Sequence, residues 1–409
     1  MRKYQDYRFM MKNSKEQKTA LPELRFPEFR DSEGWTQKIV SNVLNNQSSS
    51  LALNKLEFTE VGYPVYGADS DKIIGLISYY TQNEDYISIV KDGSGVGRLA
   101  LRQKQTSVLG TLNCLTSTEK RRYILSWLYY MMQTIDLTNY VKGSGIPHIY
   151  YADYKKHTIF IPTPREQTKI AECFSSLDDL ISAVTDKIEV LKEHKKGLMQ
   201  QLFPAEGKTT PTLRFPEFQN APAWKPKSLG SIGEIITGNT PATKEQSNYG
   251  GDRLFVSPAD ISNERYVSKT KTTLTEQGFS QSRCIKENSI LFVCIGSTIG
   301  KIAQNTIECA TNQQINSIVP YAGYISDFVY SLLEYNASKI ASTASNQAVP
   351  IINKTEFSAV TLFMPKEDEQ QAIADCLSSI DDQITAETQK LDQLKAHKKG
   401  LMQRLFPKV

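Results

Sequence analysis

A glycine-rich segment, Gly296–Lys301, gives the first indication of chemistry in this sequence. It reads Gly-Ser-Thr-Ile-Gly-Lys and is followed by Ile302. A phosphate-binding loop of the Walker type needs four residues between its glycines and a Ser or Thr after its lysine, so that loop is excluded. Two interpretations stay open: a glycine turn that presents backbone amides and a cation to a phosphodiester, or a plain hairpin turn.

No set of catalytic residues stands out elsewhere. Asp179 and Glu193–Lys195 could be assembled into a nuclease-like carboxylate–lysine set, but they belong to one predicted helix, where we expect them on solvent-exposed faces. The sequence has no Asn-Pro-Pro-Tyr-like segment, which an adenine-N6 methyltransferase needs. Neither a Ser/His/Asp triad nor a glycine-rich dinucleotide loop can be argued. We therefore predict a chain that is not an enzyme and binds no cofactor itself.

The composition is that of an ordinary soluble protein. The 409 residues suit two or three domains, 40% of them are apolar, and no apolar run approaches the length of a membrane span. The N-terminus is polar and basic without the apolar core of a signal peptide, and we interpret residues 1–20 as a loose arm. The six cysteines include no CxxC pair and only four histidines accompany them, so we expect no metal site, no disulfide framework and a reducing cytoplasm.

The net charge of +4 is too small to indicate nucleic-acid binding by itself, but its distribution is informative. Two similar segments, residues 165–204 and 366–407, together carry 12 Lys/Arg against 15 Asp/Glu. Of the 48 basic and 44 acidic residues in the chain, 36 and 29 therefore lie outside these segments. This positive excess weakly favours contacts between the remaining segments and phosphates.

Several loops interleave aromatic and basic residues, although we expect most of the tyrosines in the core or on strands. Lys142–His148 and Ser345–Pro350 lie at matching places before the two similar segments, and Thr237–Lys244 is a turn-rich segment of the same kind. Arg, Lys, Asn, Gln and Ser side chains reach phosphates and base edges. The candidate nucleic-acid-binding residues are Arg98, Lys142, Gly143, Ser144, His148, Thr240, Lys244, Ser297, Thr298, Lys301, Asn346 and Gln347. Of these, Arg98 and Lys301 end matching glycine turns and are expected at backbone phosphates.

Two long predicted helices must position these loops. Glu166–Phe203 returns as Glu369–Phe406, shifted by 203 residues without a gap. Both keep an apolar stripe of seven-residue period, interrupted by Lys195, Lys398 and Glu387, and such a stripe packs on a facing helix. The stripe consists of Ile170, Phe174, Leu177, Ile181, Val184, Ile188, Leu191, Leu198 and Leu202, and of Ile373, Leu377, Ile380, Ile384, Leu391, Leu394, Leu401 and Leu405. Each helix would be roughly 55 Å long, and the simplest partner of either copy is the other.

The helix ends carry sequence signals. Thr163–Glu166 is typical of a capping box, in which the Glu166 carboxylate reaches back to the backbone of the cap. Pro204 and Pro407 stop the two helices after a run of cationic residues, which suits the negative helix end.

The repeat extends beyond the helices. Leu24–Phe29 recurs as Leu213–Phe218, and Gly93–Arg98 corresponds to Gly296–Lys301. The chain therefore alternates variable block, helix, variable block, helix, which indicates a tandem duplication. Within the blocks we predict strands at Tyr63–Gly67, Ile73–Ile77, Tyr86–Val90, Leu254–Val256 and Ser289–Ile295, and short helices at Ser126–Gln133 and Ile325–Tyr335, which gives class α+β. The blocks are either parts of a duplicated scaffold or readers of two different targets.

This layout is similar to the specificity (S) subunit of type I restriction–modification systems, over nearly the whole chain from about Leu21. The resemblance depends on the Leu-Arg-Phe-Pro-Glu-Phe entry, on Pro-x-x-x-Glu-Gln at Pro162–Gln167 and Pro365–Gln370, and on Leu-Met-Gln-x-Leu-Phe-Pro at each helix end. It implies two mixed α/β target recognition domains, residues 21–164 and 207–365. Two long antiparallel coiled-coil helices, residues 165–206 and 366–409, would separate them with pseudo-two-fold symmetry.

The resemblance also implies a non-catalytic subunit whose two domains each read one half of a bipartite site in double-stranded DNA. Two methylation (M) subunits would dock on the chain and methylate adenine with S-adenosylmethionine. Restriction (R) subunits would translocate and cleave DNA with ATP and Mg²⁺. A rigid spacer suits half-sites roughly 34 Å apart. Two other interpretations stay open: a cytoplasmic scaffold whose blocks bind protein, and a stand-alone DNA-binding regulator.

Overall fold

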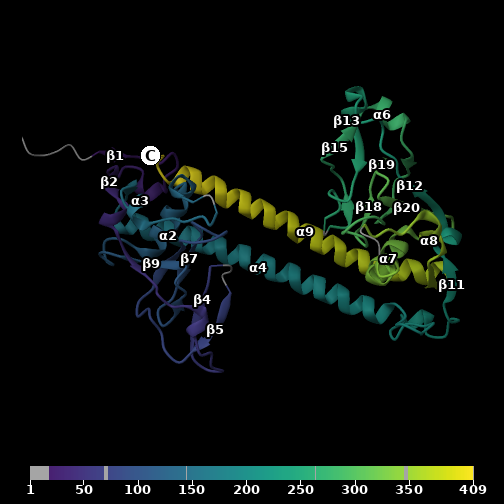
Figure 1. Cartoon of the computed structure of the whole chain (residues 1–409), viewed down its shortest axis with the longest axis horizontal. Helices are drawn as coiled ribbons and strands as arrows, with labels where there is room; N and C mark the ends of the chain where they lie inside the picture. Colours follow the sequence, from purple (N-terminus) through teal and green to yellow (C-terminus); the bar gives the residue numbers. More distant parts are fainter. Residues whose placement is uncertain (1–17, 69–71, 144, 263, 345–348, 409) are drawn as a thin grey trace, which may run out of the picture. The chain divides into compact units, whose positions relative to one another are not determined.

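The computed structural model describes residues 18–408 except 69–71, 144, 263 and 345–348. The chain divides into two compact units: unit 1 comprises Met1–Ala183 with Leu391–Val409, and unit 2 comprises Val184–Lys390. Two helices of 39 residues each, α4 (Pro164–Leu202) and α9 (Glu367–Leu405), each contribute a part to both units (Figure 1). In the described part of the chain, no helix combines the length and the apolar character that a membrane crossing requires.

The described residues of unit 1 form three sheets. The largest is antiparallel, with order β3-β9-β6-β7, formed by Leu44–Ser48, Leu112–Ser117, Tyr86–Val90 and Leu99–Arg102. The others have order β1-β2-β10, formed by Thr19–Ala20, Trp35–Ile39 and Thr158–Ile161, and order β5-β4-β8, formed by Ile73–Ile77, Tyr63–Tyr66 and Ser107–Val108. The helices are α2 (Leu125–Gln133) and α3 (Tyr151–Tyr154), with 3-10 helices η1 (Pro27–Phe29), η2 (Val40–Asn42), η3 (Leu53–Lys55) and η4 (Leu137–Tyr140).

Aromatic rings join the sheets of unit 1 to the long helices. Trp35 of β2 packs edge-on against Trp127 of α2 and against Phe406, which follows the end of α9, at ring-centroid distances of 5.9 and 6.0 Å. Phe174 of α4 stacks on the same Phe406 at 6.0 Å. Since these rings are almost fully buried, the core of the unit extends from the sheets into the helix pair.

Unit 2 repeats this plan with more strands. A sheet of order β12-β20-β17-β18-β14 is formed by Gly233–Thr237, Ile315–Pro320, Ile290–Val293, Ile302–Asn305 and Tyr266–Val267. A second sheet, β15-β13-β19-β16, is formed by Thr272–Leu274, Tyr249–Val256, Cys309–Thr311 and Cys284–Ile285, and β11 (Lys225–Ser228) pairs with β21 (Thr361–Met364). The helices are α5 (Leu229–Ile232), α6 (Glu276–Ser280), α7 (Ser326–Ala341) and α8 (Lys354–Ala359), with 3-10 helices η5 (Pro216–Phe218) and η6 (Gln246–Asn248).

Most of the secondary structure expected from the sequence is confirmed. Strands form with the predicted bounds at Ile73–Ile77 and Tyr86–Val90. The strand predicted at Leu254–Val256 is only the end of β13, because its first five residues (Tyr-Gly-Gly-Asp-Arg) carry no apolar pattern. The helix expected to end at Tyr335 continues to Ala341, where Ile340 still reaches the core of unit 2.

Three expectations about individual residues are wrong. Thr19 and Ala20 are not part of a loose arm, since they pair with Thr36 and Trp35 as strand β1. Lys195 is not on a solvent-exposed face: it is buried, because the carboxylate of Asp381 on the facing helix lies 2.7 Å from its ammonium. The Glu166 carboxylate does not close a capping box, because the Arg25 guanidinium takes it, although the Glu166 amide does donate to the Thr163 hydroxyl at 3.4 Å.

Within each unit the two long helices run antiparallel. In unit 1, Phe174 stacks on Phe406 while Asp178, one turn later on α4, pairs with Lys398, further back on α9. In unit 2, Lys187 of α4 pairs with Glu387 and the later Lys195 pairs with the earlier Asp381. Most residues of the predicted apolar stripe are buried. The charged residues that interrupt it, Lys195, Lys398 and Glu387, each pair with an oppositely charged residue of the facing helix.

Candidate nucleic-acid interface

The turns Gly93–Arg98 and Gly296–Lys301 have the same backbone in the two units. Each joins two antiparallel strands, β6 to β7 or β17 to β18. The first and fifth residues are glycines with positive φ, 98° and 84° in unit 1 and 97° and 93° in unit 2, a conformation that favours glycine. The fifth amide donates to the carbonyl of the last residue of the preceding strand, at 2.8 Å in unit 1 and 3.1 Å in unit 2. The backbone of each turn is therefore that of a hairpin. What the turn binds depends on its exposed side chains.

In unit 1 the loop Lys142–His148 lies against the glycine turn. The Gly93 amide donates to the Pro147 carbonyl at 3.0 Å. Lys142 and His148 exchange two backbone hydrogen bonds of 2.8 Å, and Gly143 adopts a φ of 97° at the start of the connection. The structure thus places this loop against the turn, and Gly143 serves the loop backbone.

The polar side chains of this loop have partners within unit 1. The Lys142 ammonium lies 2.8 Å from the Asp153 carboxylate, and His148 Nδ1 lies 2.6 Å from Asp92 Oδ1. The His148 ring stacks on Tyr150, which is itself exposed. Arg98 is exposed at the end of the glycine turn. Ser144 lies outside the described residues, as do Asn346 and Gln347 in the corresponding loop of unit 2.

In unit 2, Pro350 occupies the place of Pro147 beside the glycine turn. The Gly296 amide donates to the Pro350 carbonyl at 3.0 Å, which repeats the contact of unit 1. Ser297 is exposed and Thr298 half-buried at the turn. The Lys301 ammonium donates to the carbonyls of Pro258 and Ile261, at 3.4 and 3.0 Å, so this lysine also anchors a neighbouring loop.

Thr240 contacts the turn Asn312–Gln314, which lies beside the glycine turn of unit 2. The Thr240 hydroxyl donates to the Gln313 side-chain carbonyl at 2.7 Å. Gln314 continues toward the glycine turn, because its backbone carbonyl accepts from Cys294 at 2.8 Å. Lys244 is exposed in the loop that carries Thr240. Sequence reasoning missed Gln313; the available signal was that Gly110 stands at the corresponding position of the first block.

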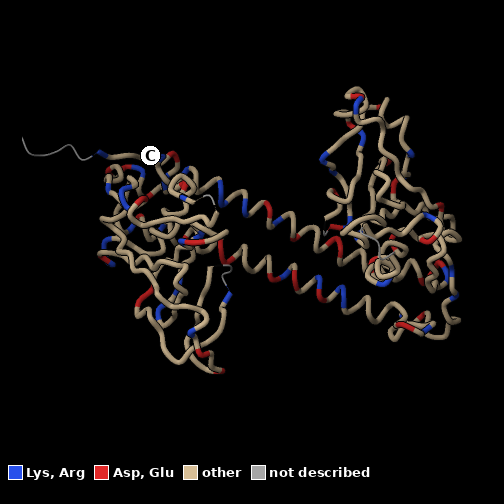
Figure 2. The backbone as a smooth tube through the Cα atoms, in the orientation of Figure 1, with Lys and Arg blue, Asp and Glu red and all other residues tan. Residues whose placement is uncertain are grey.

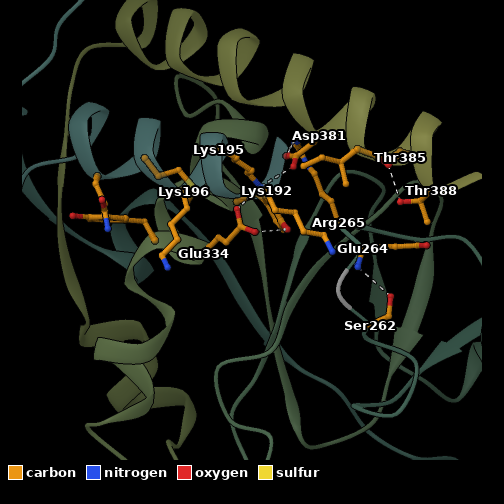
Figure 3. Close-up of a pocket in the computed structure, with 15 residues that line it drawn as sticks. Lys192, Lys195, Lys196, Ser262, Glu264, Arg265, Glu334, Asp381, Thr385 and Thr388 are labelled. Atoms are coloured by element: carbon orange, nitrogen blue, oxygen red, sulfur yellow. Dashed lines mark hydrogen bonds and ion pairs between the residues drawn. The ribbon is translucent and has the colours of Figure 1, made fainter. Parts of the chain in front are cut away.

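A buried cluster of charges connects this surface to the helices. Arg265, 4% exposed, lies in the loop whose carbonyls hold Lys301. Its guanidinium donates to Gln304 at 2.9 Å and lies 2.6 Å from Asp327. It also lies 3.3 Å from Asp381 of α9, as Figure 3 shows. Buried charges are tolerated when paired and hydrogen-bonded, and breaking one such pair is costly. The cluster therefore fixes the loop of the block on the long helix.

Lys195 brings α4 into the same cluster. Its ammonium lies 2.7 Å from Asp381 and 2.6 Å from Glu334 of α7 (Figure 3). A cavity of about 730 Å³ opens beside it, and Lys192 and Lys196 of α4 also line it. In unit 1 the corresponding lysine, Lys398, pairs with Asp178.

Asp178 also accepts a hydrogen bond from the Tyr130 hydroxyl at 2.9 Å. Burial and this acidic partner raise the pKa of Tyr130. The phenol therefore stays protonated and donates a hydrogen bond to Asp178. In unit 1, half-buried Asp178 thus ties the short helix α2 to both long helices.

The long helices themselves carry charges of both signs along their length (Figure 2). Among the described residues, no group of three or more His, Cys, Asp or Glu side chains is arranged to hold a metal ion. The single-sign character that favours phosphate contact is therefore not a property of the helices.

Comparison with known proteins identifies relatives along most of the chain. A family model described as the type I restriction modification DNA specificity domain matches residues 32–193 and 222–396. The specificity subunit of the type I restriction enzyme MjaVIII from Methanocaldococcus jannaschii is 24% identical over 345 residues, 79% of each chain. The HindI specificity subunit from Haemophilus influenzae is 30% identical over 150 residues, 36% of this chain and 32% of that one.

A solved structure has the same fold. The S subunit of a type I restriction–modification system from M. genitalium superposes with a TM-score of 0.68 at 16% identity, covering 95% of this chain and 100% of that one. The two matches of the family model cover most of each block and most of the long helix that follows it.

Proposed function

The chain belongs to the family of type I restriction–modification DNA specificity subunits, and from that premise we propose that its two blocks read two independent half-sites. The recognition domains are residues 21–164 and 207–365. Residues 165–206 and 366–409 form an antiparallel coiled-coil spacer that holds the domains apart and sets the gap between half-sites. Half-sites about one duplex turn apart, roughly 34 Å, suit helices of this length.

One observation supports this proposal above the others: a single backbone frame carries different side chains in the two units. The glycine turn makes the same backbone hydrogen bonds in both units, including the bond from its first amide to the carbonyl of Pro147 or Pro350. The side chains on the frame differ, with Arg98 against Lys301 and Gly110 against Gln313. A frame fixed by backbone bonds with variable side chains is what two readers of different sequences need, since phosphate contacts give register and base-edge contacts give specificity.

The repeated outer surface of the helices supports two copies of one partner. His194, Lys196, Gly197 and Gln200 on α4 are identical to the residues 203 positions later on α9, and the His, Lys and Gln side chains are exposed in both copies. A Cβ added at Gly197 would meet no atom within 4 Å, so the fold of the chain does not require glycine there. We infer that a methylation subunit packs closely on this face of each helix.

The catalytic steps belong to the partner subunits. The methylation subunits carry S-adenosylmethionine and methylate adenine, and the restriction subunits use ATP and Mg²⁺ to translocate and cleave DNA. This chain recognises the target sequence in double-stranded DNA and binds none of these cofactors itself. Because the target is cellular DNA, we place the complex in the cytoplasm.

Exchange of one block tests the half-site proposal. The chain is produced with methylation subunits in cells that lack other methyltransferases, and the methylated motif is read by sequencing the methylated bases. Replacing residues 29–164 with the matching block of another specificity subunit should change one half of the motif and leave the other half and the gap unchanged. If both halves change together, or neither does, the blocks do not read independent half-sites.

A further inference from the structure

We propose that Gln313 reads a base edge in the half-site of unit 2, and that Thr240 holds the Gln313 amide in the reading orientation. The proposal rests on the function proposed above, since it requires unit 2 to read one half-site. It adds the residue, the base class and the orienting contact.

The geometry brings the two side chains together at the surface. Gln313 is exposed in the turn between β19 and β20, and Thr240 is exposed in the loop that follows β12. A Cβ on Gly238 would lie 2.2 Å from the Thr311 carbonyl oxygen, so only glycine allows this loop to lie directly on the turn. The contact that results is the 2.7 Å hydrogen bond from the Thr240 hydroxyl to Gln313 Oε1.

The neighbouring amides have structural partners. Asn312 Nδ2 donates to Gln314 Oε1 at 2.9 Å, and Gln314 Nε2 donates to the Ile295 carbonyl at 3.4 Å. Both side chains therefore hold the turn to itself and to the glycine turn. Gln313 instead contacts an exposed hydroxyl of another loop, and a hydrogen bond between exposed side chains adds little to stability.

The first block shows that the frame does not need this side chain. The carbonyl of Gln314 accepts from the Cys294 amide at 2.8 Å, and in unit 1 the carbonyl of Thr111 accepts from the Lys91 amide at 2.9 Å. The residue that precedes Thr111 is Gly110, which corresponds to Gln313. The same turn thus forms with no side chain at this position. Gln313 is a feature of the second reader alone.

The oriented amide fits adenine. A side-chain carbonyl oxygen has two lone pairs, and the Thr240 hydroxyl occupies one. The other lone pair and the Nε2 hydrogens match the N6 donor and N7 acceptor that adenine presents in the major groove. An amide fixed before binding loses less side-chain freedom on contact. Lys244 and the Lys301 turn, on the same surface, suit the flanking phosphates.

Methylation profiling of the complete complex tests the assignment. Q313A should relax one A·T position in the half-site of unit 2, with the preference at that position falling about 10- to 100-fold, and leave the unit 1 half-site unchanged. T240V should relax the same position to a smaller degree, and T240S, which keeps the hydroxyl, should restore it. Q219A removes an exposed glutamine from the entry segment of unit 2 and serves as the matched control.

Three results would overturn the assignment. The first is an unchanged motif in Q313A, and the second is relaxation at a G·C position. The third is an equal loss of methylation at every site, which would make Gln313 a structural residue. A wild-type complex that methylates no two-part motif would instead contradict the function proposed above, so the two failures are distinguishable.

Discussion

Arg25 and Glu166 form a two-pronged ion pair, with Nε to Oε1 at 2.7 Å and Nη2 to Oε2 at 2.8 Å, although 141 residues separate them in the chain. The pair fastens the entry of the first block to the first turn of α4, and Trp35 donates to the same carboxylate at 3.2 Å. Arg214, Trp224 and Glu369 repeat the arrangement in unit 2. The Leu-Arg-Phe-Pro-Glu-Phe and Glu-Gln motifs are far apart in the sequence, but the arginine of the first pairs with the glutamate of the second in each unit, which forms one joint.

Replacing Glu166 with alanine should strongly destabilise unit 1. The Glu166 side chain is 1% exposed, and its removal leaves a buried guanidinium without its carboxylate. Loss of one partner of a buried pair costs about 3 to 5 kcal/mol, here toward the lower end because Arg25 also donates to the backbone carbonyls of Ser32 and Glu33. Denaturant unfolding measures the effect. The nearby exposed Glu172 is the control, and if E172A and E166A cost the same, the joint does not stabilise the unit.

Two aspartates at equivalent positions, Asp381 and Asp178, should differ in their contribution to stability. Asp381 pairs with both Lys195 and Arg265, so D381A leaves two cations buried and should cost about 3 to 5 kcal/mol. Asp178 pairs with Lys398 and Tyr130 at a more exposed place, and D178A should cost about 1.5 to 3 kcal/mol.

Each aspartate has an exposed neighbour, Asp382 or Asp179, as its control. Calorimetry of the four alanine variants should rank D381A below D178A in stability, with D382A and D179A close to the wild type. An equal cost for D381A and D178A would contradict the role assigned to the Arg265 cluster.

The sequence revealed the duplication, the long helices and their pairing, because a seven-residue apolar period and a repeat of 203 residues are local patterns. It also placed the Lys142–His148 and Ser345–Pro350 loops at matching positions before the two helices. It did not reveal that Lys195 would be buried, since a lysine within an amphipathic helix is normally solvated. Asp381 explains that burial, and it comes from a helix almost two hundred residues away.

The sequence did not point to Gln313 as a candidate residue, for a different physical reason. Its partner Thr240 lies 73 residues earlier, and the close contact of their loops depends on the missing side chain of Gly238. No period or motif records a contact between two irregular loops. The same holds for Arg265, whose partners lie on β18, α7 and α9.

Alanine at Gly197 and Gly400 should stabilise this chain and weaken its complex. A Cβ at either position meets nothing within 4 Å, and glycine inside a helix costs roughly 0.5–1 kcal/mol relative to alanine. The free energy of unfolding of the isolated chain should therefore rise by about that amount for each substitution. Binding of the methylation subunit, measured by titration calorimetry, should weaken because the added methyl groups stand between the two surfaces.

S182A, a substitution in the same α4 helix, is the control for the helix propensity of alanine. Unchanged affinity in the double variant G197A/G400A would show that this face is not where the partner packs. A bulkier pair, G197L/G400L, sharpens the outcome, since leucine at a true contact should abolish the complex.

Arg98 provides a test of phosphate contact at the glycine turn of unit 1. Lys301 also holds the carbonyls of Pro258 and Ile261, so its removal would disturb the loop that carries Arg265. Arg98 is exposed at the end of its turn, where a cation reaches the backbone more readily than base edges. R98A should therefore weaken DNA binding of the complex equally for all sequences, and lower the slope of log affinity against log salt by about 0.9 for the phosphate lost.

The exposed Arg121, outside the turn and the loop, provides the control R121A. A change in the preferred sequence with an unchanged salt slope would make Arg98 a base reader. If neither affinity nor slope changes, the turn contributes only its backbone. The salt slope separates these outcomes because each phosphate contact releases counterions from the duplex, whereas a hydrogen bond to a base edge releases none.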